Sequence, residues 1–270
     1  MKPAPFDYLR AASLAEAHAA LAAEGSDAAV IAGGQTLVPL LSMRMARPNV
    51  LVDIMHVEEL GGIRLDGGSI RVGAAVRQAA LLAWPELAAK QPLLAAALPL
   101  VGHWQTRARG TVCGSIALAD PSAELPLVLA ALDGEVFLSS STGRRSVKAG
   151  AFFTGLMSTA RRDDELIEAV SFPCGRAGEG FAFREFARRH GDFAIVACAA
   201  IVTGETVRLA VGGVADRPVA RDFADASDDA LAAFAAELDA RDDLHASADY
   251  RRDLVQRLGR ATIEEAKCRA

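Results

Sequence analysis

The stretch Ile31-Ala32-Gly33-Gly34-Gln35-Thr36-Leu37 ends an apolar run and leads into a segment of helical character. Glycine lets a backbone come close to a ligand and adopt positive φ, and successive amide N–H groups in such turns form a concave nest that holds anions, phosphates above all. A second stretch of this kind is Arg109-Gly110-Thr111-Val112-Cys113-Gly114-Ser115, which Asp120-Pro121 and Glu124 follow closely. Two such nests with few fixed charges predict a long phosphate-bearing cofactor that is held from two sides.

The composition is that of a globular protein with a sizeable core. The chain has 270 residues, of which 51% are hydrophobic and 23% charged, and its formal net charge is −5. This length suffices for more than one domain, and the charges offer neither the basic stripe of a nucleic-acid-binding protein nor a polybasic membrane-binding run. Residues 1–10 lack the pattern of an export signal, and no apolar stretch reaches the length of a membrane span, so a cytoplasmic protein is predicted.

The cysteines and histidines show no pattern of a metal site. Cys113, Cys174, Cys198 and Cys268 are widely spaced and contain no Cys-x-x-Cys pair, which favours reduced, buried thiols over an iron–sulfur cluster. The five histidines have no metal-ligand spacing, and no Ser-His-Asp or Cys-His arrangement is legible. We therefore expect neither a metal ion nor a catalytic nucleophile on this chain.

The first fifty residues read as a small α/β unit. Ser13 and Glu16 form a capping box, and Gly25 can end the helix that follows. Residues 28–32 are a short buried strand leading into the first nest, Thr36 can cap a helix through Met45, and residues 50–54 are another strand.

A mixed α+β segment follows, and the Gly- and Pro-rich residues 173–180 are the main domain boundary. A hairpin is predicted around Asp66-Gly67-Gly68 and another around Gly204-Glu205. Further helices are expected at 78–83, 93–100, 123–132, 228–238 and 249–265. Further strands are expected at 135–140, 144–147, 165–172, 180–187 and 195–214.

The nests fit neither of the common nucleotide loops. The Rossmann fold needs Gly-x-Gly-x-x-Gly, and a Walker loop needs a following Gly-Lys-Ser/Thr. Gly33-Gly34 alone also fits an ordinary turn, but the helix start at Thr36 adds a hydroxyl donor for an anion. Asp120 and Glu124 can bind ribose hydroxyls, or they can be acidic charges at a helix N-terminus.

Taken together, the two stretches resemble the FAD-binding medium subunit of the molybdenum hydroxylases, the family of carbon monoxide dehydrogenase and xanthine dehydrogenase. The family pattern is Ala-Gly-Gly-x-Ser/Thr-Leu, then Gly-Thr-Ile/Val-Gly-Gly-Ser-x-x-His-Ala-Asp-Pro. This chain has residues 32–37 in the first part and residues 110–121 in the second. Asp164-Glu165-Leu166-Ile167 and Arg188-Arg189-His190-Gly191-Asp192-Phe193-Ala194 also match, so the resemblance covers essentially the whole chain.

The resemblance implies an α+β fold with two FAD-binding subdomains of the PCMH type, residues 1–56 and 57–174. A C-terminal α+β domain, residues 175–270, similar to that of carbon monoxide dehydrogenase flavoproteins, carries a sheet covered by helices. FAD is expected between the first two subdomains, with its pyrophosphate on the first nest and an aromatic residue, Phe193, near the isoalloxazine. The implied cofactor-binding residues are Ile31, Ala32, Gly33, Gly34, Gln35, Thr36, Leu37, Val101, Gly102, Thr111, Gly114, Ser115, Ala117, Asp120, Glu124, Leu166, Glu185 and Phe193.

Three departures from the family pattern bear on the flavin. Cys113 replaces a frequent glycine, so its backbone cannot need strongly positive φ. Leu118 stands where many relatives have histidine, and Glu185 occupies a position where some place lysine. A carboxylate there disfavours an anionic reduced flavin, which leaves the flavin potential undetermined.

The function implied by the resemblance is an FAD-carrying electron-transfer subunit. It takes electrons from [2Fe–2S] clusters on a small partner subunit, while a large molybdopterin subunit hydroxylates the substrate, in a complex that can be a dimer of heterotrimers. Two alternatives stay open: a self-sufficient flavin oxidase, and a non-catalytic assembly subunit without flavin. The sequence determines neither the substrate nor the final electron acceptor.

Overall fold

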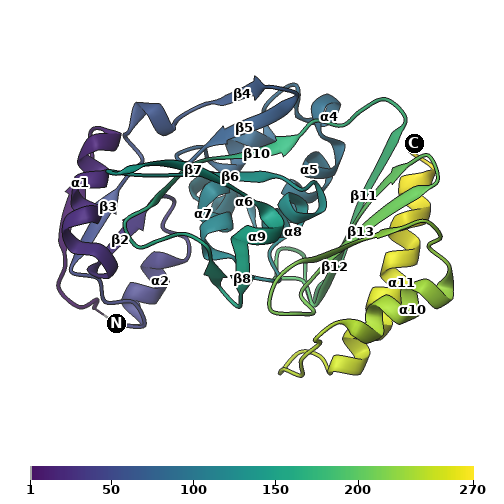
Figure 1. The fold of residues 1–270 in the computed structure, drawn as a ribbon. Coiled ribbons are helices and arrows are strands. Elements are labelled where there is room, and N and C mark those ends of the chain that lie inside the picture. The colour runs from purple at the N-terminus through teal and green to yellow at the C-terminus, as the bar shows by residue number, and fades with distance from the viewer. Residues whose placement is uncertain (1) are drawn as a thin grey trace.

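The computed structural model describes residues 2–270. Among these residues the strands form three larger sheets and one two-stranded sheet, with helices around and between them. Figure 1 shows the larger sheets in succession from the N-terminal to the C-terminal end of the molecule, with α10 and α11 on the outer side of the last sheet. This mixed helix-and-sheet architecture confirms the predicted α+β fold class.

The N-terminal sheet is parallel, with strand order β1-β3-β2. Helix α1 begins at the predicted capping box, where Ser13 Oγ accepts a hydrogen bond from the Glu16 N–H at 3.2 Å and Glu16 Oε2 accepts one from the Ala12 N–H at 2.8 Å. The elements of this lobe are β1 Asp7–Arg10, α1 Leu14–Glu24, η1 Gly25–Asp27, β2 Ala28–Ile31, α2 Leu37–Ser42, β3 Val50–Asp53 and η2 Glu58–Leu60.

The helix after the first glycine stretch is shorter than predicted. Thr36 stands at its N-terminus, but the hydroxyl makes no capping hydrogen bond, and its backbone is already helical at φ −104° and ψ −47°. The helix ends at Ser42 rather than Met45, and Arg44 adopts φ 58°, a left-handed conformation that an α-helix cannot contain. The expectation that Thr36 caps the helix through its side chain was therefore wrong.

The middle sheet is antiparallel, with strand order β4-β5-β10-β6-β7. Its central strand β10 comes last in sequence and inserts between β5 and β6. The strands are β4 Ile63–Asp66, β5 Ser69–Gly73, β6 Glu135–Ser140, β7 Gly143–Lys148 and β10 Leu166–Pro173, and β8 Phe153–Gly155 pairs with β9 Ser158–Thr159. The helices are α3 Gln78–Leu82, α4 Leu87–Lys90, α5 Pro92–Ala97, η3 Leu98–Leu100, α6 Trp104–Arg109, α7 Val112–Leu118, α8 Glu124–Ala131 and α9 Ala149–Phe152.

The second glycine stretch is helical, which the sequence prediction missed. It spans the end of α6, the link Gly110-Thr111, and the first turns of α7. Thr111 Oγ1 caps α7 by accepting a hydrogen bond from the Gly114 N–H at 3.1 Å. Cys113 lies inside this helix, which agrees with the expectation that its backbone has no positive φ.

The C-terminal sheet is antiparallel, with strand order β11-β12-β13-β14, and lies between two layers of helices. Side chains alternate along β11: Arg184 pairs with Glu265 of α11 at 2.6 Å, whereas Phe181 and Phe183 join the core of the middle lobe. Helices α5 and α8 therefore cover the face that α10 and α11 leave free. The elements are β11 Glu179–Phe186, β12 Val196–Thr203, β13 Thr206–Gly212, β14 Val219–Phe223, α10 Asp228–Glu237 and α11 Ala248–Lys267.

Edge strands β1 and β14 are absent from the sequence prediction. Each pairs on one side only, and both carry exposed charged residues such as Asp7 and Asp222, which hide the apolar alternation. Each of the three larger sheets is built within one of the three predicted domain ranges. The boundaries at residues 56 and 174 stay a prediction.

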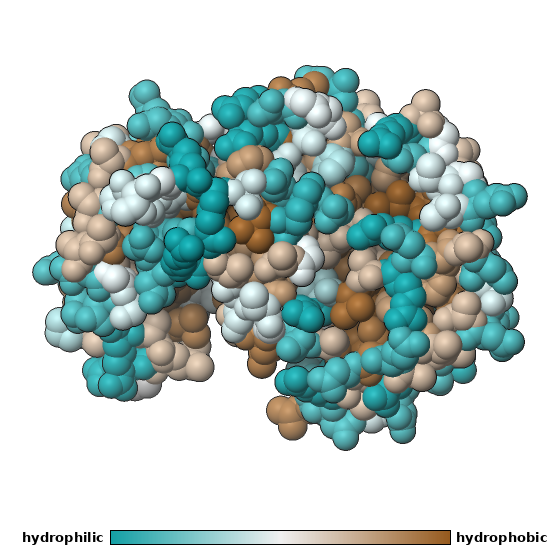
Figure 2. All heavy atoms as spheres, viewed as in Figure 1, coloured by the Kyte–Doolittle hydropathy of each residue, from teal (hydrophilic) through white to brown (hydrophobic). Residues whose placement is uncertain are grey.

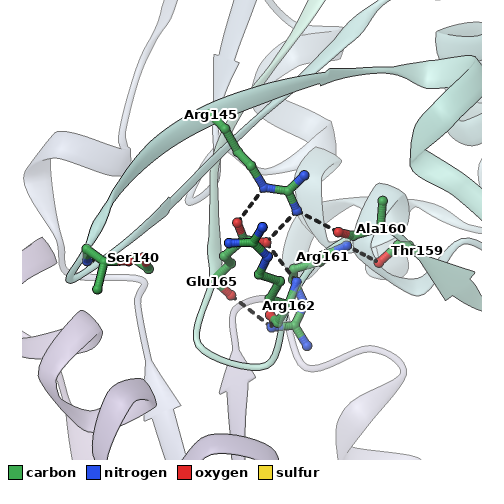
Figure 3. A network of polar contacts seen from close by, with 8 residues as sticks. Ser140, Arg145, Thr159, Ala160, Arg161, Arg162 and Glu165 are labelled. Atoms are coloured by element: carbon green, nitrogen blue, oxygen red, sulfur yellow. Dashed lines mark hydrogen bonds and ion pairs between the residues drawn. The ribbon is translucent and has the colours of Figure 1, made fainter.

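An ion pair between a half-buried arginine and a buried glutamate fixes the loop that leads into β10 (Figure 3). Arg145 of β7 donates two hydrogen bonds to the Glu165 carboxylate, at 2.6 Å and 2.7 Å, and a third to the Ala160 carbonyl at 2.6 Å. Glu165 Oε2 also accepts the N–H of Arg162 at 2.7 Å, and Glu165 is only 4% exposed. Such a bidentate pair with its remaining oxygen positions occupied holds a loop in one conformation.

Replacing Glu165 with Gln is expected to lower the free energy of unfolding by about 1–3 kcal/mol at neutral pH, because charged hydrogen bonds are lost from a buried site. The hydrogen bond from Arg145 holds the pKa of Glu165 below its usual value. The stabilisation is thus present above the ordinary glutamate pKa and is lost as pH falls through the lower folded-state pKa. Thermal unfolding at several acidic pH values should show E165Q and wild type converging.

The matched control for this variant is Glu205→Gln, which removes an exposed turn carboxylate. It should change stability little at any pH. A constant difference between E165Q and wild type down to the most acidic samples would show that the ion pair is not the source of the stabilisation.

Candidate functional site

The first glycine stretch presents a row of unused backbone donors. It forms the turn between β2 and α2, and Gly34 adopts φ +70°, which a residue with a side chain takes up only with strain. Among residues 2–270, no atom accepts a hydrogen bond from the backbone N–H of any residue from Gly33 to Leu37. Consecutive free amides on a glycine turn are the donor set that a phosphate or pyrophosphate needs.

The second stretch differs, because the fold already uses most of its amides. The N–H groups of Gly110, Val112, Gly114 and Ser115 donate to Thr106 O, Val76 O, Thr111 Oγ1 and Thr111 O. Thr111 itself is 2% exposed. The prediction of two equivalent nests was therefore wrong: the first stretch can bind an anion through its backbone, whereas the second is the capped start of a helix.

What the second stretch offers is one face of α7. Gly114 and Ala117, three residues apart on this helix, are exposed, and Ser115 is half-buried beside them. Because these side chains are small, a ligand can approach the backbone of α7 closely on this face, and Ser115 adds a hydroxyl. Figure 2 shows the molecular surface hollowed between the lobe that carries α2 and the lobe that carries β8.

The two stretches touch at one point. A Cβ added to Gly33 would lie 2.3 Å from the Arg109 carbonyl oxygen and 2.7 Å from Gly110 Cα. Arg77 braces the far side of this contact, because its Nη1 donates to the carbonyls of Ala108 and Arg109 at 3.0 Å and 3.1 Å. Glycine at position 33 is thus required by the close approach of the lobes, while the amides beyond it stay open.

Three predicted carboxylates gather between the middle lobe and the C-terminal sheet. Glu124 begins the fully buried helix α8 and is 3% exposed. Burial, together with the nearby carboxylates of Glu185 and Asp120, raises the pKa of Glu124 to about 7. Burial also raises the pKa of Glu185 to about 7, and Glu185 Oε2 has no hydrogen-bond partner among residues 2–270. Near neutral pH, each of these two glutamates can therefore donate a hydrogen bond as an acid or accept one as a carboxylate.

Asp120 is the third member, and it plays a partly local role. Its Oδ1 accepts a hydrogen bond from the Ser122 N–H at 2.9 Å, which fixes the turn before α8. Burial raises the pKa of Asp120 above its usual value. Of the two readings of Asp120 and Glu124 from the sequence, the structure shows the position at a helix entry, and the binding of ribose hydroxyls stays a prediction.

The loop at Val101 and Gly102 meets the C-terminal domain. Arg107 Nη1 donates to the carbonyls of Val101 and Gly102, both at 2.9 Å, and so fixes the loop. Gly191, at φ +84°, lies against it, and a Cβ added there would be 2.7 Å from the His103 ring. Two residues further on, Phe193 is 58% exposed, which rules out plain core packing for this aromatic ring.

Leu166 stands apart from the other predicted residues. It is the first residue of β10, only 2% exposed, and part of the main core. The structure thus brings the first stretch together with the start of the second, and Asp120 with Glu124 and Glu185, but it leaves Leu166 without an open surface.

The structure also shows supporting residues that sequence reasoning missed. They are Arg77 and Arg107, described above, and Gln78, which is 4% exposed and donates through Nε2 to the Thr111 carbonyl at 3.4 Å. All act on backbone carbonyls, a role with no motif. Arg77 and Gln78 reach carbonyls distant in sequence, whereas Arg107 reaches carbonyls of the loop just before its own helix.

The burial of the cysteines differs from one to the next. Cys113 and Cys198 are buried as predicted, and burial raises the pKa of the Cys113 thiol to about 12, whereas Cys268 is exposed, contrary to the prediction. Within residues 2–270, no three His, Cys, Asp or Glu side chains converge as a metal site. No helix in the same range has the length and apolar character to cross a membrane.

Comparison with known proteins decides the family. The FAD-binding domain of molybdopterin dehydrogenases matches residues 4–175. The chain belongs to this FAD-binding family. It is 39% identical to the 6-hydroxypseudooxynicotine dehydrogenase complex subunit alpha of Paenarthrobacter nicotinovorans, over all of this chain and 97% of that one.

Two carbon monoxide dehydrogenases extend the likeness to the C-terminal domain. The medium chain from Afipia carboxidovorans is 33% identical over all of this chain and 99% of its own length. A chain in the structure of carbon monoxide dehydrogenase from Hydrogenophaga pseudoflava superposes with a TM-score of 0.92 at 32% identity, with both chains fully covered. The protein is thus an oxidoreductase subunit of the molybdenum hydroxylase family, as the sequence motifs predicted.

Gly33→Ala is expected to lower the free energy of unfolding by about 1–3 kcal/mol and to reduce the FAD content, because the new Cβ overlaps the Arg109 carbonyl. The matched control is Gly150→Ala, since nothing lies within 4 Å of a Cβ added at Gly150. Chemical unfolding and flavin extraction measure the two effects. If Gly33→Ala behaves like Gly150→Ala, the contact between the stretches does not position them.

Glu124→Gln is expected to raise stability at alkaline pH by about 1–3 kcal/mol and to have little effect in mild acid. Between the ordinary glutamate pKa and about 7, the folded state keeps the Glu124 proton that the unfolded chain has released. Wild type is therefore most stable below the ordinary glutamate pKa, and it loses stability as pH rises to about 7, whereas glutamine does not titrate. Thermal unfolding of the flavin-free chain on both sides of neutrality tests this. An equal effect of E124Q at both pH values contradicts it.

Proposed function

We propose that this chain binds FAD in the hollow between its first two lobes and acts as the electron-transfer subunit of a molybdopterin-dependent hydroxylase or dehydrogenase. The observation that carries the proposal is the row of free amides from Gly33 to Leu37 on a turn with Gly34 at φ +70°. Those donors fit a pyrophosphate without any fixed cation. The family match over residues 4–175 supports FAD as the molecule that bears it.

The chain's own residues fit FAD in distinct ways. The turn after Ile31 and Ala32 donates its amides, and the exposed side chains of Gln35 and Thr36 lie at the same rim. The low face of α7 lets a ligand lie close to Gly114 and Ala117, with the Ser115 hydroxyl available. We assign the pyrophosphate to the first stretch and the adjoining ribityl or ribose portion to α7.

Around the isoalloxazine we place the groups that the middle lobe and the C-terminal domain bring together. Phe193 offers a flat apolar surface, and Val101 and Gly102 lie in the loop against which Gly191 packs. Glu124 and Glu185 supply protonatable oxygens with a pKa of about 7. Thr111 acts by capping α7, and Leu166 acts through packing, so neither needs to touch the cofactor.

The chemistry of the bound flavin is the acceptance of single electrons and the delivery of a pair. This chain positions the cofactor and sets its electrostatic surroundings. A carboxylate at Glu185 disfavours negative charge nearby, whereas its protonated form does not, so the local field changes near neutral pH. No general acid or base for substrate hydroxylation is needed on this chain.

We further propose that the partners are a small subunit with [2Fe–2S] clusters, which supplies the electrons, and a large molybdopterin subunit. The support is that relatives are named as subunits or medium chains of dehydrogenase complexes, and that another similar solved structure is of a Cu,Mo carbon monoxide dehydrogenase. The assembly is assigned to the cytoplasm, as a possible dimer of heterotrimers.

Purification of the assembled complex is expected to give stoichiometric FAD on this chain, detected by absorbance and by extraction after denaturation. Anaerobic reduction of the iron–sulfur subunit should be followed by bleaching of the flavin. A well-folded complex without FAD would contradict the proposal and support the alternative of a non-catalytic assembly subunit. Rapid substrate turnover by this chain alone would support the self-sufficient oxidase instead.

A further inference from the structure

The motif from Arg188 to Ala194 does more than present Phe193. It forms the connection between β11 and β12, and together with the loop between α10 and α11 it walls a cavity of about 390 Å³. Arginine side chains dominate the polar part of this wall. The lining residues include Arg188, Arg189, Asp192, Phe193, His245 and Arg251.

Two of the three arginines are already paired. Arg189 Nε lies 3.2 Å from Asp192 Oδ2. Arg251, 5% exposed, donates to Asp243 Oδ2 at 2.5 Å and to the carbonyls of Ile195 and Gly213, both at 2.6 Å. These contacts use both carboxylates of the cavity wall, Asp192 and Asp243.

Arg188 is left without a carboxylate. Within residues 2–270, the Arg188 side chain contacts His245, with Nη1 lying 3.4 Å from Nδ1 of the ring. The wall therefore carries one uncompensated guanidinium next to an imidazole. An exposed guanidinium fork of this kind binds carboxylate, sulfonate or phosphate oxygens in a bidentate manner.

The cavity wall is held in place from behind. Asp243 Oδ1 accepts the N–H groups of His245 and Ala246 at 2.8 Å and 3.0 Å, so the buried Arg251 fixes the loop that carries His245. On the other side, Gly191 lies against His103, and the rings of His103 and His190 are 6.3 Å apart. The pocket is thus preorganised rather than formed by two free loops.

We propose that this cavity binds the oxyanion group of the molecule that reoxidises the flavin, with Arg188 as its main ligand. This inference rests on the proposed function, because Phe193 forms part of the same wall and is the residue placed beside the isoalloxazine. Since Arg188 and Phe193 line the same cavity, a molecule anchored by its anionic end at Arg188 can contact the exposed Phe193 ring. The site therefore selects acceptors that combine a flat redox ring with a carboxylate, sulfonate or phosphate.

The test uses the assembled complex and two acceptors with the same ring system, naphthoquinone and naphthoquinone sulfonate. The variant is Arg188→Gln, and the control is Arg257→Gln, which removes an arginine that is 82% exposed on α11. The complex is reduced with dithionite, and anaerobic mixing with each acceptor gives the rate of flavin reoxidation. Calorimetry on the oxidised complex gives the Kd for naphthoquinone sulfonate independently of turnover.

R188Q should weaken sulfonate binding and slow reoxidation by the sulfonate about tenfold, while reoxidation by uncharged naphthoquinone changes less than about twofold. R257Q should leave both unchanged. Inorganic phosphate or acetate should compete in the calorimetric titration of wild type, and the stronger competitor identifies the natural anionic group. Flavin content should be the same in all samples.

Three results overturn the inference: an equal effect of R188Q on both acceptors, no effect on either, or loss of flavin from R188Q, which would make Arg188 part of the cofactor site. A complex without FAD defeats the proposed function instead, and the calorimetric titration then still reports whether the cavity binds the anion.

Discussion

The approach of Gly33 to the backbone of Arg109 and Gly110 fixes how the first two lobes meet. At this point there is no room for a Cβ, so the turn after β2 and the link between α6 and α7 lie in direct contact. Arg77 holds the second partner through two carbonyls, which fixes that side of the contact. The free amides beyond Gly33 are therefore presented at the junction of two lobes, rather than on a mobile surface turn.

The two glycine stretches differ in how many of their backbone amides remain free. Amides that already donate within the fold cannot bind a ligand without breaking structure, and most of those in the second stretch are engaged in this way. The first stretch keeps its donors free because its turn leads into α2 without a side-chain cap at Thr36. The first stretch can thus donate hydrogen bonds to a ligand, whereas the second offers a helix face of small residues that a ligand can approach closely.

The C-terminal domain contributes through its loops rather than its sheet. Its sheet packs on α5 and α8 and so closes over the buried start of α8, which places Glu185 of β11 near Glu124. Water cannot solvate these carboxylates freely, and their affinity for protons rises to the physiological range. The β11–β12 connection brings Phe193 and Arg188 into the wall of one cavity, so the groups that we propose act on the electron acceptor come from the third lobe.

Much of this could be read from the sequence because local rules suffice for it. Hydrophobic alternation and turn residues gave the hairpins at residues 63–73 and 196–212, the capping box gave α1, and the paired motifs gave the family. The site residues with backbone roles, Gly33 and Gly34, were recognisable because glycine is needed where a Cβ cannot fit or φ is positive. The helical α6 and α7 were missed, since the glycines within and between them lower helix propensity and only tertiary packing compensates.

The sequence by itself thus determined the fold class, the family and the glycine turn to which we assign the pyrophosphate, each of which depends on residues close together along the chain. Only the tertiary structure decided, within residues 2–270, which amides remain free, which carboxylates lose their water, and which arginine of the C-terminal cavity has no carboxylate partner. Those properties depend on partners far away in sequence, such as Val76 for the Val112 amide or the Ile195 carbonyl for Arg251. No local pattern specifies them, because hydrogen bonding and burial are settled only when the lobes have packed.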